Sequence, residues 1–385
     1  MPKTYRFLDT KLIHAGEPDP LVGGAVSMPI FQSSTFAYAG QGNYHDLKYI
    51  RLNNTPNHQA LHTKLAALEN AEAALVTASG MAAISAVLLT LLKPGDHLLA
   101  QGCLYGGTHD LLTGDLSELG IAFDFIEGDR PGTWEAKRRP NTRLLYCETM
   151  TNPLLEVADL KALAAFAREK GMVSVIDNTF ASPVNFRPAE WHFDLSVHSC
   201  TKYLNGHSDI VAGAVIGPRN LVEAVTRKLN HLGGSLDPHA CFLLHRGLKT
   251  LAVRMRYQNE SALRIARFLE AHPAVETVNY PGLESHSGHR RATELFEGYG
   301  GMLSFEVRYG LEAAQRFLEK VSLPVVAPSL GGVESLVTRP ATTSHAGMSP
   351  EDRRSLGITD SLIRLSVGLE ATEDLIDDFK QALKS

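Results

Sequence analysis

The chain has 385 residues, of which 44% are hydrophobic and 21% charged, with a formal net charge of −5. This length is too great for one compact core, so we expect two or three domains. The acidic balance provides no basic surface for nucleic acid, and no apolar stretch is long enough to span a membrane.

Residues 1–60 are rich in Gly, Pro, Asn, Ser and Thr and show little periodicity, which predicts an extended N-terminal arm. The first residues contain no apolar signal segment. From His58 onward the apolar pattern becomes helical. His58 and His62 have the i, i+4 spacing that metal ligands can use, but no third ligand accompanies them. We therefore expect both histidines on a solvated helix face and predict no metal site.

Over residues 61–250, short apolar strands alternate with helical segments. We expect helices at 82–92 and 160–170, and strands at 97–100, 122–126, 143–147, 173–177, 195–198 and 210–216. This alternation predicts an α/β domain with a mostly parallel sheet. Ligands of such sheets bind outside the carboxyl ends of the strands, so polar residues at those ends are candidate site residues.

Two of the predicted strands lead directly into polar residues. The strand at 173–177 ends in Asp177, and the strand at 195–198 is followed by Ser199, Thr201 and Lys202. Pyridoxal phosphate (PLP) needs a lysine for a Schiff base, a carboxylate for its pyridinium nitrogen, and hydroxyls or amides for its phosphate. These four residues meet those needs, and a partly desolvated Lys202 amine would also serve as a base. The alternative for Asp177 is a helix cap.

The helix predicted at 82–92 follows Ser79, Gly80 and Met81. A helix N-terminus after a glycine offers free amides to an anion, so we expect Gly80 and Met81 to complete the phosphate site. Ordinary N-capping by Ser79 is the alternative.

Beyond residue 250 the pattern changes. We expect one long arginine-bearing helix through Arg246 and Arg264, strands at 275–280, 302–307 and 362–366, and a final helix at 371–383. This predicts a smaller α+β domain over residues 251–385. No Gly/Ser-rich linker separates it from residues 61–250, so we expect the two domains to pack together.

Four cysteines are widely spaced and form no CxxC pair: Cys103, Cys147, Cys200 and Cys241. We expect them to be buried free thiols, which favours a reducing compartment and a cytoplasmic location.

Six motifs in order along the chain resemble the Cys/Met-metabolism family of PLP enzymes. They are Ser-Gly-Met-Ala at 79–82, Tyr-Gly-Gly-Thr at 105–108, Thr-Asn-Pro at 151–153, Asp-Asn-Thr-Phe at 177–180, the segment around Lys202, and Ile-Arg-Leu-Ser-Val-Gly at 363–368. The resemblance runs from about His14 to the C-terminal helix. It implies the fold-type I PLP architecture and a homotetramer, built as a dimer of dimers with shared active sites.

The resemblance also implies roles for single residues. Tyr105 would stack on the cofactor ring and exchange protons with the leaving group. Arg364 would bind the substrate α-carboxylate with support from Asn152 and Ser329; read in isolation, Arg364 would instead form an ion pair with an acidic residue. The pair Tyr49 and Arg51 would cross to the neighbouring subunit and bind its phosphate.

Two departures from the family pattern bear on the substrate. Gly107 stands where methionine γ-lyases typically carry a cysteine, and Pro328 stands where many bacterial γ-synthases and γ-lyases carry a glutamate. The leading interpretation is an enzyme that makes or breaks a C–S bond at Cγ of a homoserine-derived amino acid, as a cystathionine γ-synthase or γ-lyase. Cystathionine β-lyase, methionine γ-lyase, an aminotransferase on the same fold, and a non-catalytic PLP-binding regulatory protein stay open.

Overall fold

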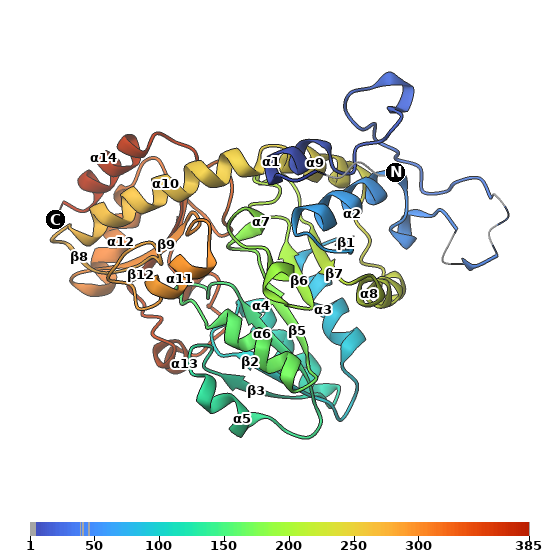
Figure 1. Ribbon diagram of the computed structural model, residues 1–385. Helices are drawn as coiled ribbons and strands as arrows, with labels where there is room; N and C mark the ends of the chain where they lie inside the picture. Colours follow the sequence, from blue (N-terminus) through green and yellow to red (C-terminus); the bar gives the residue numbers. More distant parts are fainter. Residues whose placement is uncertain (1–4, 39, 41, 45–46, 385) are drawn as a thin grey trace.

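The computed structural model describes residues 5–38, 40, 42–44 and 47–384. Its larger part is built on a seven-stranded sheet with strand order β1-β7-β6-β5-β4-β2-β3 (Figure 1). The strands are β1 (Ala73–Thr77), β2 (His97–Gln101), β3 (Ala122–Ile126), β4 (Thr142–Glu148), β5 (Val173–Asp177), β6 (Leu195–Ser199) and β7 (Gly213–Gly217). β7 runs antiparallel to both neighbours, and the remaining pairs are parallel. The predicted mostly parallel sheet is therefore confirmed.

Helices cover both faces of this sheet. The core on one face contains side chains of α2 (Pro56–Leu68) and α6 (Leu160–Glu169), and the core on the other contains those of α3 (Gly80–Leu91) and α8 (Arg219–Leu232). Along β2, Leu98 and Ala100 belong to the α3 side, whereas Leu99 belongs to the α2 side. Because successive strand residues point to opposite faces, a continuous apolar run is what a strand covered on both sides requires. The shorter helices are α4 (Gly106–Asp110), α5 (Trp134–Lys137) and α7 (Ser182–Asn185).

The smaller part contains a five-stranded mixed sheet with the order β10-β11-β12-β9-β8. Its strands are β8 (Val275–Asn279), β9 (Met302–Val307), β10 (Val325–Val326), β11 (Leu336–Thr338) and β12 (Leu362–Ser366). The helices around it are α11 (His289–Leu295), α12 (Gly310–Lys320), α13 (Pro350–Ser355) and α14 (Thr372–Ala382), and α9 (Pro238–Leu248) precedes it in the chain.

The helix α10 (Leu251–Glu270) joins the two parts, as its course in Figure 1 shows. Leu251 and Met255 near its start belong to the core of the larger part, whereas Ile265 and Leu269 near its end belong to the core of the smaller part. One rigid helix thus shares its buried face between both cores, as expected for packed rather than tethered domains. The domain boundaries at 60 and 250 stay a prediction.

Two local predictions were wrong, and one strand was missed. The N-terminal arm is not extended throughout, because α1 (Leu8–His14) packs against α2 and α10. The single long arginine helix is two helices, α9 and α10, separated at Lys249 and Thr250. The edge strand β1 was not predicted.

His58 also differs from its prediction, because it is fully buried rather than solvated. Its Nε2 donates to the carbonyl of Leu236 at 2.7 Å, and its Nδ1 therefore accepts from the hydroxyl of Thr55, also at 2.7 Å. Burial lowers the pKa of neighbouring His62 to about 3. Within the described ranges, no group of three His, Cys, Asp or Glu side chains lies close enough to hold a metal ion.

The four cysteines are buried and free, as predicted. None of the helices in the described part of the chain is long and apolar enough to cross a membrane.

Candidate active site

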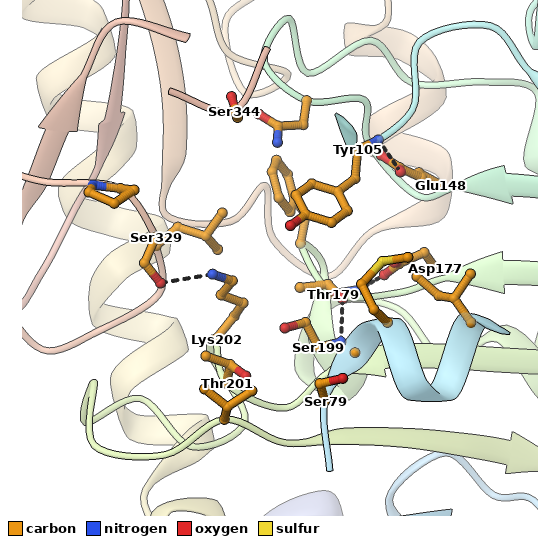
Figure 2. A pocket seen from close by; sticks show the side chains of 18 of the residues that line it. Ser79, Tyr105, Glu148, Asp177, Thr179, Ser199, Thr201, Lys202, Ser329 and Ser344 are labelled. Carbon is orange, nitrogen blue, oxygen red and sulfur yellow. Dashed lines mark hydrogen bonds between the residues drawn. The ribbon is translucent and has the colours of Figure 1, made fainter. Parts of the chain in front are cut away.

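A cavity of about 620 Å³ opens where β4, β5 and β6 end and the smaller sheet approaches (Figure 2). Ten of the twelve predicted site residues line it: Gly80, Met81, Tyr105, Asn152, Asp177, Ser199, Thr201, Lys202, Ser329 and Arg364. The structure therefore brings together residues that lie almost 300 positions apart, because both sheets contribute walls to the same cavity.

Lys202 lies in the turn after β6, and its Nζ donates to the hydroxyl of Ser329 at 2.8 Å (Figure 2). Burial lowers the pKa of Lys202 to about 8, and the nearby charge of Arg364 acts in the same direction. The amine is therefore much more often neutral near physiological pH than an exposed lysine, as the base role requires.

Asp177 ends β5 on the opposite side of the cavity, and its Oδ1 accepts the N–H of Thr179 at 2.9 Å. This contact closes a local turn, so the alternative structural role of the carboxylate is also present. Burial raises the pKa of Asp177, whereas the hydrogen bonds from Thr179 lower it. No described Lys or Arg forms an ion pair with Asp177, so this half-buried carboxylate has capacity for a cationic partner.

The start of α3 and the end of β6 form the third wall of the cavity. Ser79 caps α3 by accepting the N–H of Ala82 at 3.0 Å, so the simpler reading of Ser79 is confirmed. A Cβ atom on Gly80 would lie 2.9 Å from the Cβ of Ser199, which means that only glycine allows this close approach.

The hydroxyls near this wall are not equally free. Thr179, which was not predicted, accepts the N–H of Ser199 at 2.8 Å and so fixes the end of β6. The Thr201 hydroxyl donates to the carbonyl of Ala212 at 3.2 Å and accepts its N–H at 3.0 Å. In this structure the proton of the Thr201 hydroxyl thus serves the backbone of the neighbouring segment.

Arg364 lies on β12 and is 4% exposed. Its Nη1 donates to the side-chain oxygen of Asn152 at 3.0 Å, and its Nη2 donates to the carbonyl of Ser329 at 3.1 Å. Among the described residues no carboxylate pairs with it, which contradicts the ion-pair reading. Burial lowers the pKa of Arg364 to about 10. A buried guanidinium held only by neutral acceptors is suited to an incoming carboxylate.

Tyr105 follows β2 and projects into the cavity, where its ring is seen between Ser344 and the strand ends (Figure 2). Its backbone N–H donates to Oε1 of Glu148 at 2.7 Å. Glu148 was not predicted as a site residue, because the strand was expected to end at Cys147. The rule that identified Asp177, a carboxylate at the carboxyl end of a parallel strand, would also have identified Glu148.

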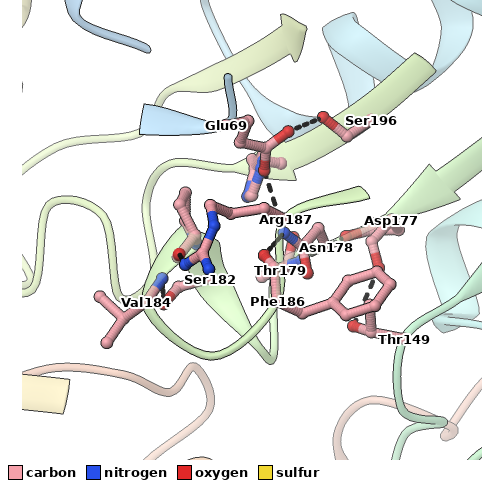
Figure 3. A network of polar contacts seen from close by, with 12 residues as sticks. Glu69, Thr149, Asp177, Asn178, Thr179, Ser182, Val184, Phe186, Arg187 and Ser196 are labelled. Atoms are coloured by element: carbon pink, nitrogen blue, oxygen red, sulfur yellow. Dashed lines mark hydrogen bonds and ion pairs between the residues drawn. The ribbon is translucent and has the colours of Figure 1, made fainter. Parts of the chain in front are cut away.

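Another buried carboxylate, Glu69 at the end of α2, lies outside the cavity lining and belongs to a network of polar contacts (Figure 3). It accepts hydrogen bonds from Asn178 Nδ2 at 2.9 Å, from His198 Nε2 at 2.7 Å and from the Ser196 hydroxyl. Asn178 follows Asp177, and His198 precedes Ser199. Glu69 therefore ties together the two strand ends that carry the cavity side chains. The sequence contains no motif that reveals this network.

Tyr49 and Arg51 do not line the cavity of their own chain. Arg51 Nη1 donates to the carbonyl of Asn230 at 2.8 Å, and its Nη2 donates to the Tyr44 hydroxyl. The guanidinium carbon lies 5.8 Å from the ring centre of Tyr49, which is 39% exposed. The pair thus forms one cluster outside the site.

Residues 9–384 match the family described as Cys/Met metabolism PLP-dependent enzyme. The chain belongs to this family. It is 43% identical over 377 residues to a cystathionine γ-lyase of Bacillus subtilis, covering 98% of this chain and 99% of the relative. It is 42% identical to a cystathionine β-lyase of Coxiella burnetii, with 98% and 97% covered. The crystal structure of a cystathionine γ-lyase from Lactobacillus plantarum, complexed with L-serine, superposes with a TM-score of 0.94 at 37% identity, covering 99% of both chains.

The protein is therefore a PLP-dependent trans-sulfuration enzyme with the fold-type I architecture. The donor set of the cavity fits this cofactor. It offers the Lys202 amine, the Asp177 carboxylate, which no described Lys or Arg pairs, and the hydroxyls beside the start of α3, where Gly80 lets the chain approach Ser199 closely.

Proposed function

We propose that this enzyme makes or breaks the C–S bond at Cγ of a homoserine-derived amino acid, as a cystathionine γ-lyase or γ-synthase. The observation that carries the proposal is the convergence of Lys202 and Arg364 on Ser329. The lysine amine bonds to the Ser329 hydroxyl, and the guanidinium bonds to its carbonyl. A substrate held by its α-carboxylate at Arg364 would thus present its reacting carbons beside the amine of Lys202.

The roles of the cofactor and of the surrounding side chains follow from their chemistry. PLP, when bound, supplies the electron sink that stabilises negative charge on the substrate. Lys202 holds the cofactor and then moves protons at the substrate carbons, for which its pKa of about 8 is suited. Arg364 orients the substrate through its carboxylate, and Asn152 keeps the guanidinium plane in place.

The remaining predicted residues have proposed roles as well. Asp177 would pair with the pyridinium nitrogen, because no described Lys or Arg forms an ion pair with its half-buried carboxylate. Ser199, Thr201, Gly80 and Met81 would surround the phosphate. Tyr105 would contact the cofactor and the leaving group, since its side chain projects into the cavity.

The relatives support more than one substrate choice. The Bacillus subtilis and Lactobacillus plantarum proteins carry the name γ-lyase, and the Coxiella burnetii protein carries the name β-lyase. Pro328 and Val211 line the cavity, so the position where many γ-enzymes carry a glutamate is apolar here. This apolar part of the cavity favours a substrate whose distal end does not need to pair with a carboxylate side chain of the enzyme. An activated homoserine ester is such a substrate.

Product analysis with the purified holoenzyme tests the proposal. Cystathionine and, separately, an activated homoserine ester with cysteine are supplied. Reaction at Cγ yields cysteine with 2-oxobutyrate from the first, or cystathionine from the second. Pyruvate and homocysteine from cystathionine, with neither of these products, would replace the proposal with β-elimination.

We further infer a cytoplasmic homotetramer, a dimer of dimers in which Tyr49 and Arg51 of one subunit complete the site of another. The location of this cluster outside its own cavity supports the crossing. The four free, buried thiols support a reducing compartment.

A further inference from the structure

Glu148 connects two segments that border the cavity. Its backbone N–H donates to Gln101 Oε1 at 3.0 Å, and its side-chain Oε1 accepts the N–H of Tyr105 at 2.7 Å. Gln101 is the last residue of β2, and Tyr105 lies four positions later. Glu148, the last residue of β4, thus bonds to the first and the last part of the connection between β2 and α4. This connection carries the Tyr105 side chain (Figure 2).

Glu148 also lies beside Asp177. The two residues are register partners in the parallel pair β4–β5. Register partners in neighbouring parallel strands have side chains on the same face, and the strands lie about 4.8 Å apart. Both carboxyl groups line the cavity. Two carboxylates in this position cannot both be ionised without strong repulsion.

Among the residues that the structure describes, none supplies a compensating positive charge to Glu148. The titratable groups that interact electrostatically with Glu148 are Asp177 on β5, Tyr146 and Cys147 on β4, and Cys103 on the β2–α4 connection. Burial raises the pKa of Tyr146, Cys147 and Cys103, so these three are neutral, and no described Lys or Arg forms an ion pair with Glu148.

We propose that Glu148 is a positioning residue that stays protonated while Asp177 is ionised, and that this neutral acid holds the backbone of Tyr105 in place. The carbonyl-type oxygen of a protonated carboxyl still accepts the Tyr105 N–H. The single negative charge is then left to Asp177, where a pyridinium nitrogen needs it. Burial and the charge of Asp177, which together raise the pKa of Glu148 well above its usual value, agree with this assignment. The proposal rests on the bound cofactor and not on which C–S bond reacts.

Three variants test the charge of Glu148 separately from its role as a hydrogen-bond acceptor. Glu148→Gln keeps the acceptor and the neutral state, whereas Glu148→Ala removes the acceptor. Glu306→Gln, on β9 outside the cavity, is the control for a neutralised strand glutamate. We expect Glu148→Gln to retain kcat within about threefold of wild type and Glu148→Ala to lose at least about tenfold, which corresponds to one lost positioning contact.

Infrared difference spectroscopy of the holoenzymes provides a readout independent of turnover. Wild type minus Glu148→Gln should show the carbonyl band of a protonated carboxylic acid at neutral pH, and wild type minus Glu306→Gln should not. The cofactor absorbance of Glu148→Gln should titrate as in wild type. A carboxylate band in place of the acid band, or a Glu148→Gln enzyme as impaired as Glu148→Ala, would overturn the proposal. Wild-type kinetics in a folded Glu148→Ala enzyme would overturn the positioning role. If Glu148→Ala does not fold, the spectrum of Glu148→Gln decides alone.

Discussion

The amine of Lys202 and the hydroxyl of Ser329 are joined by a hydrogen bond of 2.8 Å, which connects the turn after β6 of the larger sheet with the loop between β10 and β11 of the smaller sheet. Ser329 has a φ of +89°, a conformation that non-glycine residues rarely adopt, and its carbonyl accepts a bond from Arg364. One strained residue thus holds both the lysine and the arginine of the site, as residues in unusual conformations at active sites often do.

The role of the Ser329 hydroxyl can be tested with two substitutions. Both remove the hydroxyl, but they differ in the conformational cost of the positive φ. Ser329→Ala and Ser329→Gly both remove the hydroxyl that accepts from Lys202, so both should lower kcat by about threefold to thirtyfold. Glycine also relieves the cost of the positive φ, so the Gly variant should melt at a higher temperature than the Ala variant. Equal activity of both variants and wild type would show that the hydroxyl plays no part.

Arg364→Lys should raise KM by about tenfold or more and change kcat less, because a lysine cannot make the two-pronged contact with a carboxylate. Arg256→Lys is a matched control, since Arg256 lies on α10 and pairs with Asp9 at an exposed site. Steady-state kinetics with one substrate at several concentrations measures both constants. An unchanged KM would mean that the carboxylate binds elsewhere.

Asp177→Asn should weaken the binding of PLP and slow turnover by more than about tenfold, since the loss of a charge-assisted hydrogen bond is of this size. The substitution is nearly isosteric, so the turn contact from Thr179 can persist. Cofactor titration of the apoenzyme and kcat of the loaded enzyme measure the two effects separately. Near-wild-type values for both would contradict the pairing of Asp177 with the cofactor nitrogen.

A mixture of Arg51→Ala and Lys202→Ala subunits should recover activity if the site is shared. In a heterodimer, one site receives an intact lysine from one chain and an intact arm from the other, while the second site carries both lesions. About half of the wild-type sites should then work. A mixture of Tyr49→Ala and Arg51→Ala is the control, because each site then receives one damaged arm. Verified heterodimers without recovery would place each site within one chain.

The sequence predicted much of the larger sheet because buried parallel strands appear as short apolar runs. Asp177 and Ser199 could be located for the same reason, since parallel strands deliver their last residues to one edge of the sheet. Thr250 gives no such signal, because Lys249 and Thr250 are compatible with a helix. The two helices differ instead in their tertiary contacts, since α9 packs against α2 and α10 packs against β8 and α14. β1 was missed because its Ala-rich run suits a helix as well as a strand.

The buried network around Glu69 depends on tertiary contacts alone. Glu69 reaches His198 and Asn178 only after α2 has packed on the sheet, and no spacing in the chain encodes that meeting. His58 was misassigned for a related reason: its partners, Thr55 and the carbonyl of Leu236, make a buried imidazole tolerable.

The central claim is that Lys202 carries the cofactor. Reducing the holoenzyme with borohydride, digesting it and mapping the labelled peptide tests this directly. The account predicts a pyridoxyl group on Lys202, in the peptide that contains Thr201 and Tyr203, and no stable label in Lys202→Ala. A pyridoxyl group on any other lysine of the wild-type enzyme would contradict the assignment of the site.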